Sequence, residues 1–239
     1  MGAALHRRAR PGHNGQMAEP PSARPPAGHA SPAGHPAFGS QWWEQHYQEQ
    51  APGPATPSRH LVAEVTGLGA GTALDAGCGT GADAVWLAQE GWLVTAVDIS
   101  PTVVGRAERL AAEQAPDLAA RISWVVADLT HWEPPAPYDL VVSQYVHPDV
   151  PFPVFVERLA RCVAPGGTLF VAGHDHADGH SAAHAPEPAS IGPAAVTSVL
   201  SADLWHVDVA ETRTRPVNHG AAEETMHDVV VVARRTESS

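Results

Sequence analysis

The stretch from Leu74 to Gly81, with the sequence Leu-Asp-Ala-Gly-Cys-Gly-Thr-Gly, constrains the fold of this chain more than any other. Thr72-Ala73-Leu74 predicts a short buried strand before it, and residues 82–91 predict a helix after it that stops at a glycine. Glycines allow a positive φ and a close approach of the backbone to a ligand, and a helix start offers unpaired N–H donors. A strand, a glycine-rich turn and a helix start in this order predict a site for a nucleotide-like ligand.

The spacing of the glycines argues against a diphosphate ligand. A dinucleotide fingerprint reads G-x-G-x-x-G and binds a pyrophosphate. This stretch instead reads D-x-G-x-G-x-G, with Asp75 ahead of Gly77, Gly79 and Gly81. A carboxylate at Asp75 would repel a phosphate but could pair, directly or through water, with an ammonium group. The spacing therefore disfavours a nicotinamide-dependent oxidoreductase.

A second acidic residue, Asp98, follows the next apolar strand, 92–97. A carboxylate at the carboxyl end of the second strand suits the two hydroxyls of a ribose. A ligand with an amino group, a ribose and no phosphate suggests S-adenosylmethionine. The alternative is a tight strand-to-helix turn without a ligand, which needs only one of the three glycines.

The glycine stretch resembles the first motif of class I S-adenosylmethionine-dependent methyltransferases, and Val97–Ser100 (Val-Asp-Ile-Ser) resembles their second. Over residues 41–235, the chain resembles the small-molecule branch of this family that includes tellurite-resistance and thiopurine methyltransferase-like proteins. The residues that carry this resemblance are Trp42-Trp43-Glu44, 73–81, 83–88 and 94–98.

The order of the predicted elements indicates an α/β fold. Strands and helices alternate, for example the helix expected from Pro101 to Gln114 and the fifth strand expected over 168–172, which requires a mostly parallel sheet with helices on both faces. The resemblance implies a doubly wound, Rossmann-like sheet of seven strands, with a C-terminal antiparallel hairpin expected over 204–214 and 225–235. Ligands bind such sheets at the carboxyl ends of the strands, where every candidate site residue falls.

The resemblance also implies which residues contact the cofactor, S-adenosylmethionine. Asp128 and the backbone at Leu129 would hold the adenine, Ile99 would cover one face of it, and Cys78 would pack as a small side chain. Gln144 begins the segment after the fourth strand that should face the sulfur of the methyl donor. An aspartate that closes a strand, as Asp128 does, is also a common cap or turn residue. The complete expected set is Asp75, Gly77, Cys78, Gly79, Gly81, Asp98, Ile99, Asp128, Leu129 and Gln144.

Two histidines are candidate catalytic residues. Methyl transfer from a sulfonium is an in-line displacement that mainly requires alignment of the acceptor, and a general base matters only when the acceptor must lose a proton. His147 and His174 lie where the fourth and fifth strands end, although the first could simply start a loop and the second cap its strand. An alternative metal site would use His174, Asp175, His176 and His180, but their spacing matches no rigid ligand pattern, so no metal is expected.

The flanking segments indicate accessory roles. Residues 1–38 are rich in Pro, Gly, Ala and His and predict a disordered tail ahead of a domain over 39–239. Within that domain, 39–58 is either a flap that folds onto the site or a helix packed on the sheet without ligand contact. Residues 174–190 form a histidine-rich loop expected at the active site.

The charge and composition exclude some partners. The formal net charge is −12, and the segment Ser143-Gln144-Tyr145-Val146 lacks the Asn-Pro-Pro-Tyr motif of many nucleic-acid amino methyltransferases. We therefore expect a small-molecule acceptor rather than nucleic acid or an anionic membrane. No apolar run reaches the ~18 residues of a membrane helix, which predicts a cytoplasmic protein, as a monomer or homodimer. A protein that binds S-adenosylmethionine without turnover is the alternative from another functional class.

Overall fold

The computed structural model describes residues 39–49, 56–175, 191–219 and 222–237. The tail expected over residues 1–38 lies outside the described residues. So does the part of the expected histidine-rich loop from 176 to 190, which includes His176 and His180.

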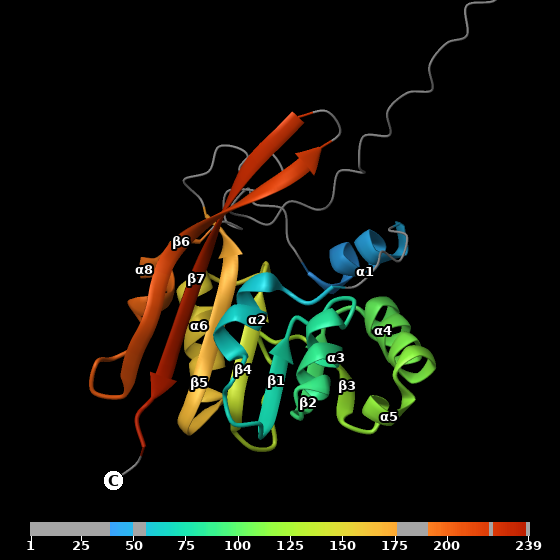
Figure 1. Cartoon of the computed structure of the whole chain (residues 1–239), viewed down its shortest axis with the longest axis horizontal. Helices are drawn as coiled ribbons and strands as arrows, with labels where there is room; N and C mark the ends of the chain where they lie inside the picture. The colour runs from blue at the N-terminus through green and yellow to red at the C-terminus, as the bar shows by residue number, and fades with distance from the viewer. Residues whose placement is uncertain (1–38, 50–55, 176–190, 220–221, 238–239) are drawn as a thin grey trace, which may run out of the picture.

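A seven-stranded sheet forms the centre of the molecule, in the order β3-β2-β1-β4-β5-β7-β6 (Figure 1). Neighbouring strands from β3 to β5 are parallel, whereas β7 is antiparallel to both β5 and β6. The strands are β1 (Thr72–Ala76), β2 (Leu93–Asp98), β3 (Ile122–Val126), β4 (Tyr138–Gln144), β5 (Val163–His174), β6 (Trp205–His219) and β7 (Ala222–Arg235). The expected α/β class, with a mostly parallel sheet and a C-terminal antiparallel hairpin, is confirmed.

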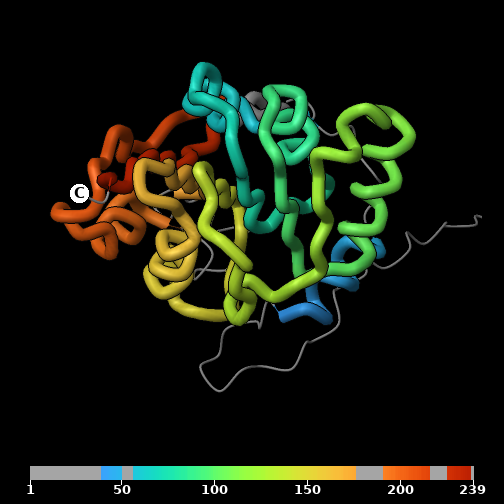
Figure 2. The backbone as a smooth tube through the Cα atoms, turned by 90° about the horizontal axis from the view of Figure 1, so that it is seen from below, coloured from blue at the N-terminus to red at the C-terminus, as the bar shows by residue number. Residues whose placement is uncertain are grey.

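Helices cover both faces of the sheet (Figure 2). Leu61 and Leu87 on one set of helices pack with Phe170 in one buried cluster, whereas Phe155 on the other set packs with Leu169 in a second. Adjacent residues of β5 thus point to opposite faces, as the pleat of a strand requires. The helices are α1 (Ser40–Glu49), α2 (Arg59–Val65), α3 (Ala82–Gln89), α4 (Pro101–Gln114), α5 (Pro116–Ala119), α6 (Phe152–Arg161) and α8 (Pro193–Thr197).

The parallel strands bring their carboxyl ends to one edge of the sheet. β1 ends at Ala76, β2 at Asp98 and β4 at Gln144, and α1 lies across this edge (Figure 1). Because β5 stops pairing at His174 and β6 and β7 continue together, the β6-β7 hairpin extends beyond the same edge. Residues far apart in the sequence therefore meet there.

Element bounds differ from the sequence expectation where tertiary pairing extends a strand. The expected helix from Pro101 to Gln114 is α4 with the same bounds, and a side-chain hydrogen bond from Val103 N to Ser100 Oγ (3.3 Å) caps it. In contrast, β5 begins five residues before the expected Thr168, because Val163 pairs with Tyr138 across an irregularity in the ladder. The hairpin strands are likewise longer than expected, because they pair with each other beyond the sheet.

Candidate functional site

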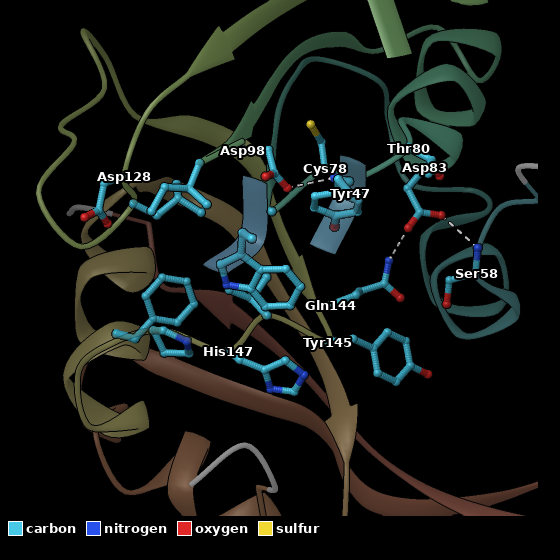
Figure 3. A pocket seen from close by; sticks show the side chains of 18 of the residues that line it. Tyr47, Ser58, Cys78, Thr80, Asp83, Asp98, Asp128, Gln144, Tyr145 and His147 are labelled. Carbon is cyan, nitrogen blue, oxygen red and sulfur yellow. Dashed lines mark hydrogen bonds between the residues drawn. The ribbon is translucent and has the colours of Figure 1, made fainter. Parts of the chain in front are cut away.

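A cavity of about 790 Å³ opens at the carboxyl edge of the sheet (Figure 3). Its walls come from α1, the start of α2, the glycine turn after β1, the segments that follow β2, β3 and β4, and one side chain of β6. The volume lies within the range of about 300–1,000 Å³ that is typical of small-molecule and cofactor sites.

The glycine turn after β1 is held against β2. The backbone N–H groups of Gly77 and Cys78 both donate to the carbonyl of Val97, at 2.8 and 2.9 Å. Gly77 and Gly81 have φ values of 89° and 82°, and a Cβ on Gly81 would lie 2.6 Å from the Trp124 ring. At these two positions the fold itself requires glycine, whatever a ligand requires.

Asp98 lies where β2 ends, on the wall of the cavity. It is 6% exposed, and its carboxylate accepts hydrogen bonds from the backbone N–H groups of Gly79 and Ser100, both at 3.0 Å. Burial raises the pKa of Asp98, although these backbone donors oppose the shift. A buried acid whose ionised form remains disfavoured has capacity for further hydrogen-bond donors from a ligand.

Two more carboxylates lie beside the glycine turn. Asp75 is buried beneath it, does not line the cavity, and its Oδ2 has no hydrogen-bond partner among the described residues. Asp83, in the first turn of α3, does line the cavity and accepts from Ser58 N at 2.8 Å and Gln144 Nε2 at 2.7 Å (Figure 3). Burial raises the pKa of both acids, and the charge of Asp83 raises that of Asp75 further.

Asp83 was not among the residues expected from the sequence. Its position in the first turn of a helix, where the dipole favours an acid, was the available signal. That signal alone does not separate a residue that caps a helix from one that faces a ligand.

Asp128 lines the cavity at the end near β3, together with Leu129 and Ile99. Its Oδ1 accepts hydrogen bonds from Thr130 N (2.8 Å) and Thr130 Oγ1 (2.6 Å). Burial acts to raise the pKa of Asp128, but the bonds from Thr130 and His131 outweigh it, so that the pKa is lowered. The carboxylate therefore also closes a local turn, which is the alternative role that its position suggested.

Helix α1 forms one wall of the cavity with Trp43 and Tyr47. Glu44 binds α1 to the start of α4, because its carboxylate accepts from Ser100 Oγ (2.6 Å), Thr102 N (3.2 Å) and Thr102 Oγ1. These hydrogen bonds, led by that of Ser100, lower the pKa of Glu44 to about 2. The segment expected to be either a flap or a packed helix thus contacts the cavity.

The last residue of β4, Gln144, and two residues of the segment after it, Tyr145 and His147, line the cavity (Figure 3). The His147 ring stacks on Trp43 with centroids 5.9 Å apart and planes at 4°. Tyr145 has a φ of 53°, the one positive value at a residue other than glycine in the described part of the chain. Such backbone strain is concentrated at functional sites.

His174, the second candidate catalytic histidine, lies apart from His147. It does not line the cavity, and its Nδ1 lies 3.3 Å from Oδ1 of the fully buried Asp228. Asp228 also contacts two residues that do line the cavity, His60 and Arg215. The sequence did not predict His60, Arg215 and Asp228 as site residues. They lie on α2, β6 and β7, and only the tertiary fold brings these elements together.

The described residues offer neither a metal-binding cluster nor a membrane-spanning helix. They contain no group of three or more His, Cys, Asp or Glu side chains arranged to hold a metal ion, and His176 and His180 of the alternative metal site lie outside them. Within the same residues, no helix has both the length and the apolar character needed to cross a bilayer.

Comparison with known proteins identifies a family model, described as a methyltransferase domain, that matches residues 73–167. The chain is 30% identical over 183 residues to the trans-aconitate 2-methyltransferase of Azoarcus sp. (strain BH72), and the aligned region covers 73% of this chain and 69% of that protein. It is 33% identical over 137 residues to the ubiquinone biosynthesis O-methyltransferase of Xylella fastidiosa (strain 9a5c), and this aligned region covers 56% of this chain and 55% of that protein. The match thus spans about half the length of the ubiquinone relatives.

Solved structures share the fold. The magnesium protoporphyrin IX methyltransferase of Synechocystis PCC 6803, solved with bound S-adenosylmethionine, superposes with a TM-score of 0.52 at 23% identity over 74% of each chain. TehB from Haemophilus influenzae superposes with a TM-score of 0.59 at 15% identity, over 82% of this chain and 67% of that one.

Proposed function

The chain belongs to the family of class I methyltransferases that use S-adenosylmethionine as cofactor, and from this membership we propose that it transfers the methyl group to a small-molecule acceptor in the cavity at the sheet edge. The observation that carries the proposal is the placement of Asp98 and Asp128 on one wall of that cavity, at the ends of adjacent parallel strands.

The donors and acceptors of the cavity fit S-adenosylmethionine. In the proposed assignment, Asp98 holds the ribose hydroxyls, and Asp128, Leu129 and Ile99 surround the adenine. The turn from Gly77 to Gly81 lies under the nucleoside, with Cys78 as a small packed residue.

The methionine part of the cofactor would face Asp83 and Gln144, which hold each other through a 2.7 Å hydrogen bond. An ammonium group there would offset the cost of the buried acids Asp83 and Asp75, the second of which has one oxygen without a hydrogen-bond partner among the described residues. Asp75 acts in this assignment beneath the turn or through water, because it does not line the cavity.

When bound, the cofactor supplies an activated methyl group on a sulfonium. The residues of this chain then align the acceptor for in-line displacement and exclude water, and alignment of this kind can lower a barrier by about 7–11 kcal/mol. Trp43 and Tyr47 of α1 close the cavity above the proposed cofactor position. His147 lines the cavity and is a candidate for proton transfer or acceptor contact, whereas His174 would act only through Asp228.

The relatives favour a small organic acceptor. Their names specify transfer to trans-aconitate and an O-methylation in ubiquinone biosynthesis. The finer assignment to a tellurite-resistance or thiopurine methyltransferase-like branch remains a proposal that rests on the sequence motifs and the shared fold with TehB.

Two measurements test the function. Isothermal titration should show binding of S-adenosylmethionine and S-adenosylhomocysteine, and radiolabelled methyl transfer should appear with at least one compound of a panel of carboxylates, phenols, thiols, selenite and tellurite. Binding of both nucleosides without transfer to any compound would favour the non-catalytic alternative. No binding of either would refute the proposal.

A further inference from the structure

A second cluster of charged and polar side chains includes Tyr145, which lies at the end of the cavity away from Asp128 (Figure 3). We name it the Asp228 cluster, after the carboxylate at its centre. Asp228 Oδ2 lies 2.5 Å from Arg215 Nε and 3.1 Å from His60 Nε2, and its Oδ1 lies 3.3 Å from His174 Nδ1. The hydroxyl of Tyr145 interacts with both Asp228 and Arg215.

The centre of the cluster is fully buried. The Asp228 side chain has no exposed surface, and a buried carboxylate is tolerated only when it is paired and hydrogen-bonded. Its partners come from α2, the end of β4, β5 and β6, so that four separate elements converge on one charge. This arrangement fixes the position of the Arg215 guanidinium before any ligand binds.

Three members of the cluster face the cavity: His60, Tyr145 and Arg215. The strained backbone of Tyr145 turns its side chain to this wall, directly after Gln144 in the proposed cofactor site. The acidic residues Asp83, Asp98 and Asp128 line other parts of the cavity, and of its two lining arginines, Arg59 is exposed whereas Arg215 is fixed by its ion pair with Asp228.

We propose that the Asp228 cluster is the acceptor subsite and that the acceptor is a small molecule with a carboxylate group, bound by Arg215. A guanidinium presents planar N–H donors that match the oxygens of a carboxylate. Asp228 and Tyr145 are the positioning residues that hold this guanidinium, since the Tyr145 hydroxyl donates to Asp228 and accepts from Arg215. The inference rests on the proposed function, because it assigns the acceptor of the same reaction.

A carboxylate acceptor also explains why no free base is required at this end. One carboxylate oxygen, already ionised at neutral pH, forms a bond to the methyl carbon while the bond from that carbon to sulfur breaks. The electron pair of the broken bond stays on sulfur, which loses its positive charge. The products are a methyl ester and S-adenosylhomocysteine, and no proton is released.

The test uses the full chain and compounds that differ only in charge. Succinate, citrate and trans-aconitate, each beside its amide, are offered with radiolabelled S-adenosylmethionine, and the product is treated with alkali, which releases methanol from a methyl ester only. We expect transfer to at least one acid and to none of the amides, with a label that alkali releases. Transfer only to thiols, phenols, selenite or tellurite, or no preference for acids over amides, would overturn the carboxylate subsite and leave the proposed function intact.

Variants assign the subsite to its residues. Arg215→Gln and Tyr145→Phe should each raise the KM for the acid roughly tenfold to a hundredfold, while S-adenosylmethionine affinity changes less than threefold. Arg213→Gln is the matched control, since Arg213 lies on the same strand, does not line the cavity and pairs with Glu64 and Glu211. Tyr145→Phe keeps the test valid if Arg215→Gln does not fold. An unchanged KM in folded Tyr145→Phe and Arg215→Gln proteins would refute the assignment, and loss of cofactor binding in the wild-type protein would refute the proposed function instead.

Discussion

Two acidic centres, the glycine turn and the Asp228 cluster, lie at the same edge of the sheet, and their surroundings shift the pKa of the carboxyl groups in opposite directions. At the glycine turn, burial raises the pKa of Asp75, Asp83 and Asp98. At the hairpin, burial also acts to raise the pKa of Asp228, but hydrogen bonds from His174, Arg215 and His60 outweigh it and the pKa falls. The protein's own donors thus leave the ionised form of the acids at the glycine turn disfavoured, whereas they favour the ionised form of Asp228.

At the glycine turn, the ionised carboxylates need further donors from a ligand, whereas the ionised form of Asp228 is favoured by donors of the protein itself. The acids at the glycine turn destabilise the free protein when ionised, and a ligand with an ammonium group and hydroxyls would relieve that cost. In the Asp228 cluster, Oδ2 of the carboxylate binds both His60 and Arg215, so that the cluster can hold the Arg215 guanidinium toward a second molecule. The contrast supports the proposals that the cofactor binds at the first centre and the acceptor at the second.

The largest effect is expected from Asp228→Asn. This change leaves Arg215 and two histidines around a neutral amide, and removal of one partner from a buried ion pair costs about 3–5 kcal/mol. Urea unfolding should therefore show a clear loss of stability.

The matched control is Asp208→Asn on the same hairpin. Asp208 is partly exposed and bonded to the exposed Arg234, a pairing that contributes little. If both variants lose the same stability, Asp228 does not organise a distinct cluster.

The next largest effect is expected at the glycine turn, where replacing Asp98 should reduce cofactor affinity rather than stability. Asp98→Ala should weaken S-adenosylmethionine binding, because each lost charge-assisted hydrogen bond is worth about 1.5–3 kcal/mol. Calorimetry measures this affinity directly. Asp98→Asn should weaken it too, yet the unliganded variant should melt no lower than the wild type, since a buried charge is removed.

A large drop in the melting temperature of unliganded Asp98→Asn would contradict the proposed contrast between the centres. Unchanged affinity in Asp98→Ala would refute the ribose assignment. The two outcomes are independent, because one is measured without ligand and the other with it.

The sequence indicated the first centre better than the second, for a physical reason. Asp98 is the last residue of β2 and Asp128 lies two residues after the end of β3. Because parallel strands carry their carboxyl ends to one edge, the local pattern was sufficient to place both residues there. His60 and Asp228 are separated by 168 residues, and they meet only through the order of strands and the length of the hairpin. No local motif encodes that meeting.

Strand length shows the same limit. The bounds of α4 follow from Pro101 and a cap at Ser100, which are local signals. β6 extends beyond the expected residue 214 because β7 pairs with it there, and this extension carries Arg215 to the cavity. The fold class was therefore predictable, and part of the site was not.

A smaller effect is expected where α1 closes the cavity. Glu44→Gln loses the charge that accepts from Ser100 and Thr102, so α1 should bind α4 less tightly. We expect S-adenosylmethionine affinity to fall by about threefold to tenfold, which corresponds to about 0.7–1.4 kcal/mol. Glu49→Gln is the control, because Glu49 lies on the same helix and its carboxylate accepts from the exposed Gln45 at 3.0 Å. It should leave the affinity unchanged, and equal losses in both variants would remove Glu44 from this role.

The smallest effect is a dependence on pH, which should have opposite directions for the stability of the unliganded protein and for cofactor affinity. Because the native pKa of Asp98 is raised, the folded protein binds more protons than the unfolded chain between the ordinary aspartate value of about 3.9 and the raised native value. The contribution of Asp98 to the stability of the unliganded protein therefore falls as the pH rises through that window. Binding of ribose hydroxyls requires the ionised carboxylate, so cofactor affinity should rise across the same window.

Titration of both the stability and the cofactor affinity in the wild type and in Asp98→Asn separates this residue from the other acids. If the two quantities changed in the same direction in the wild type, or if Asp98→Asn kept both slopes, the raised pKa of Asp98 would not link the stability of the protein to cofactor binding.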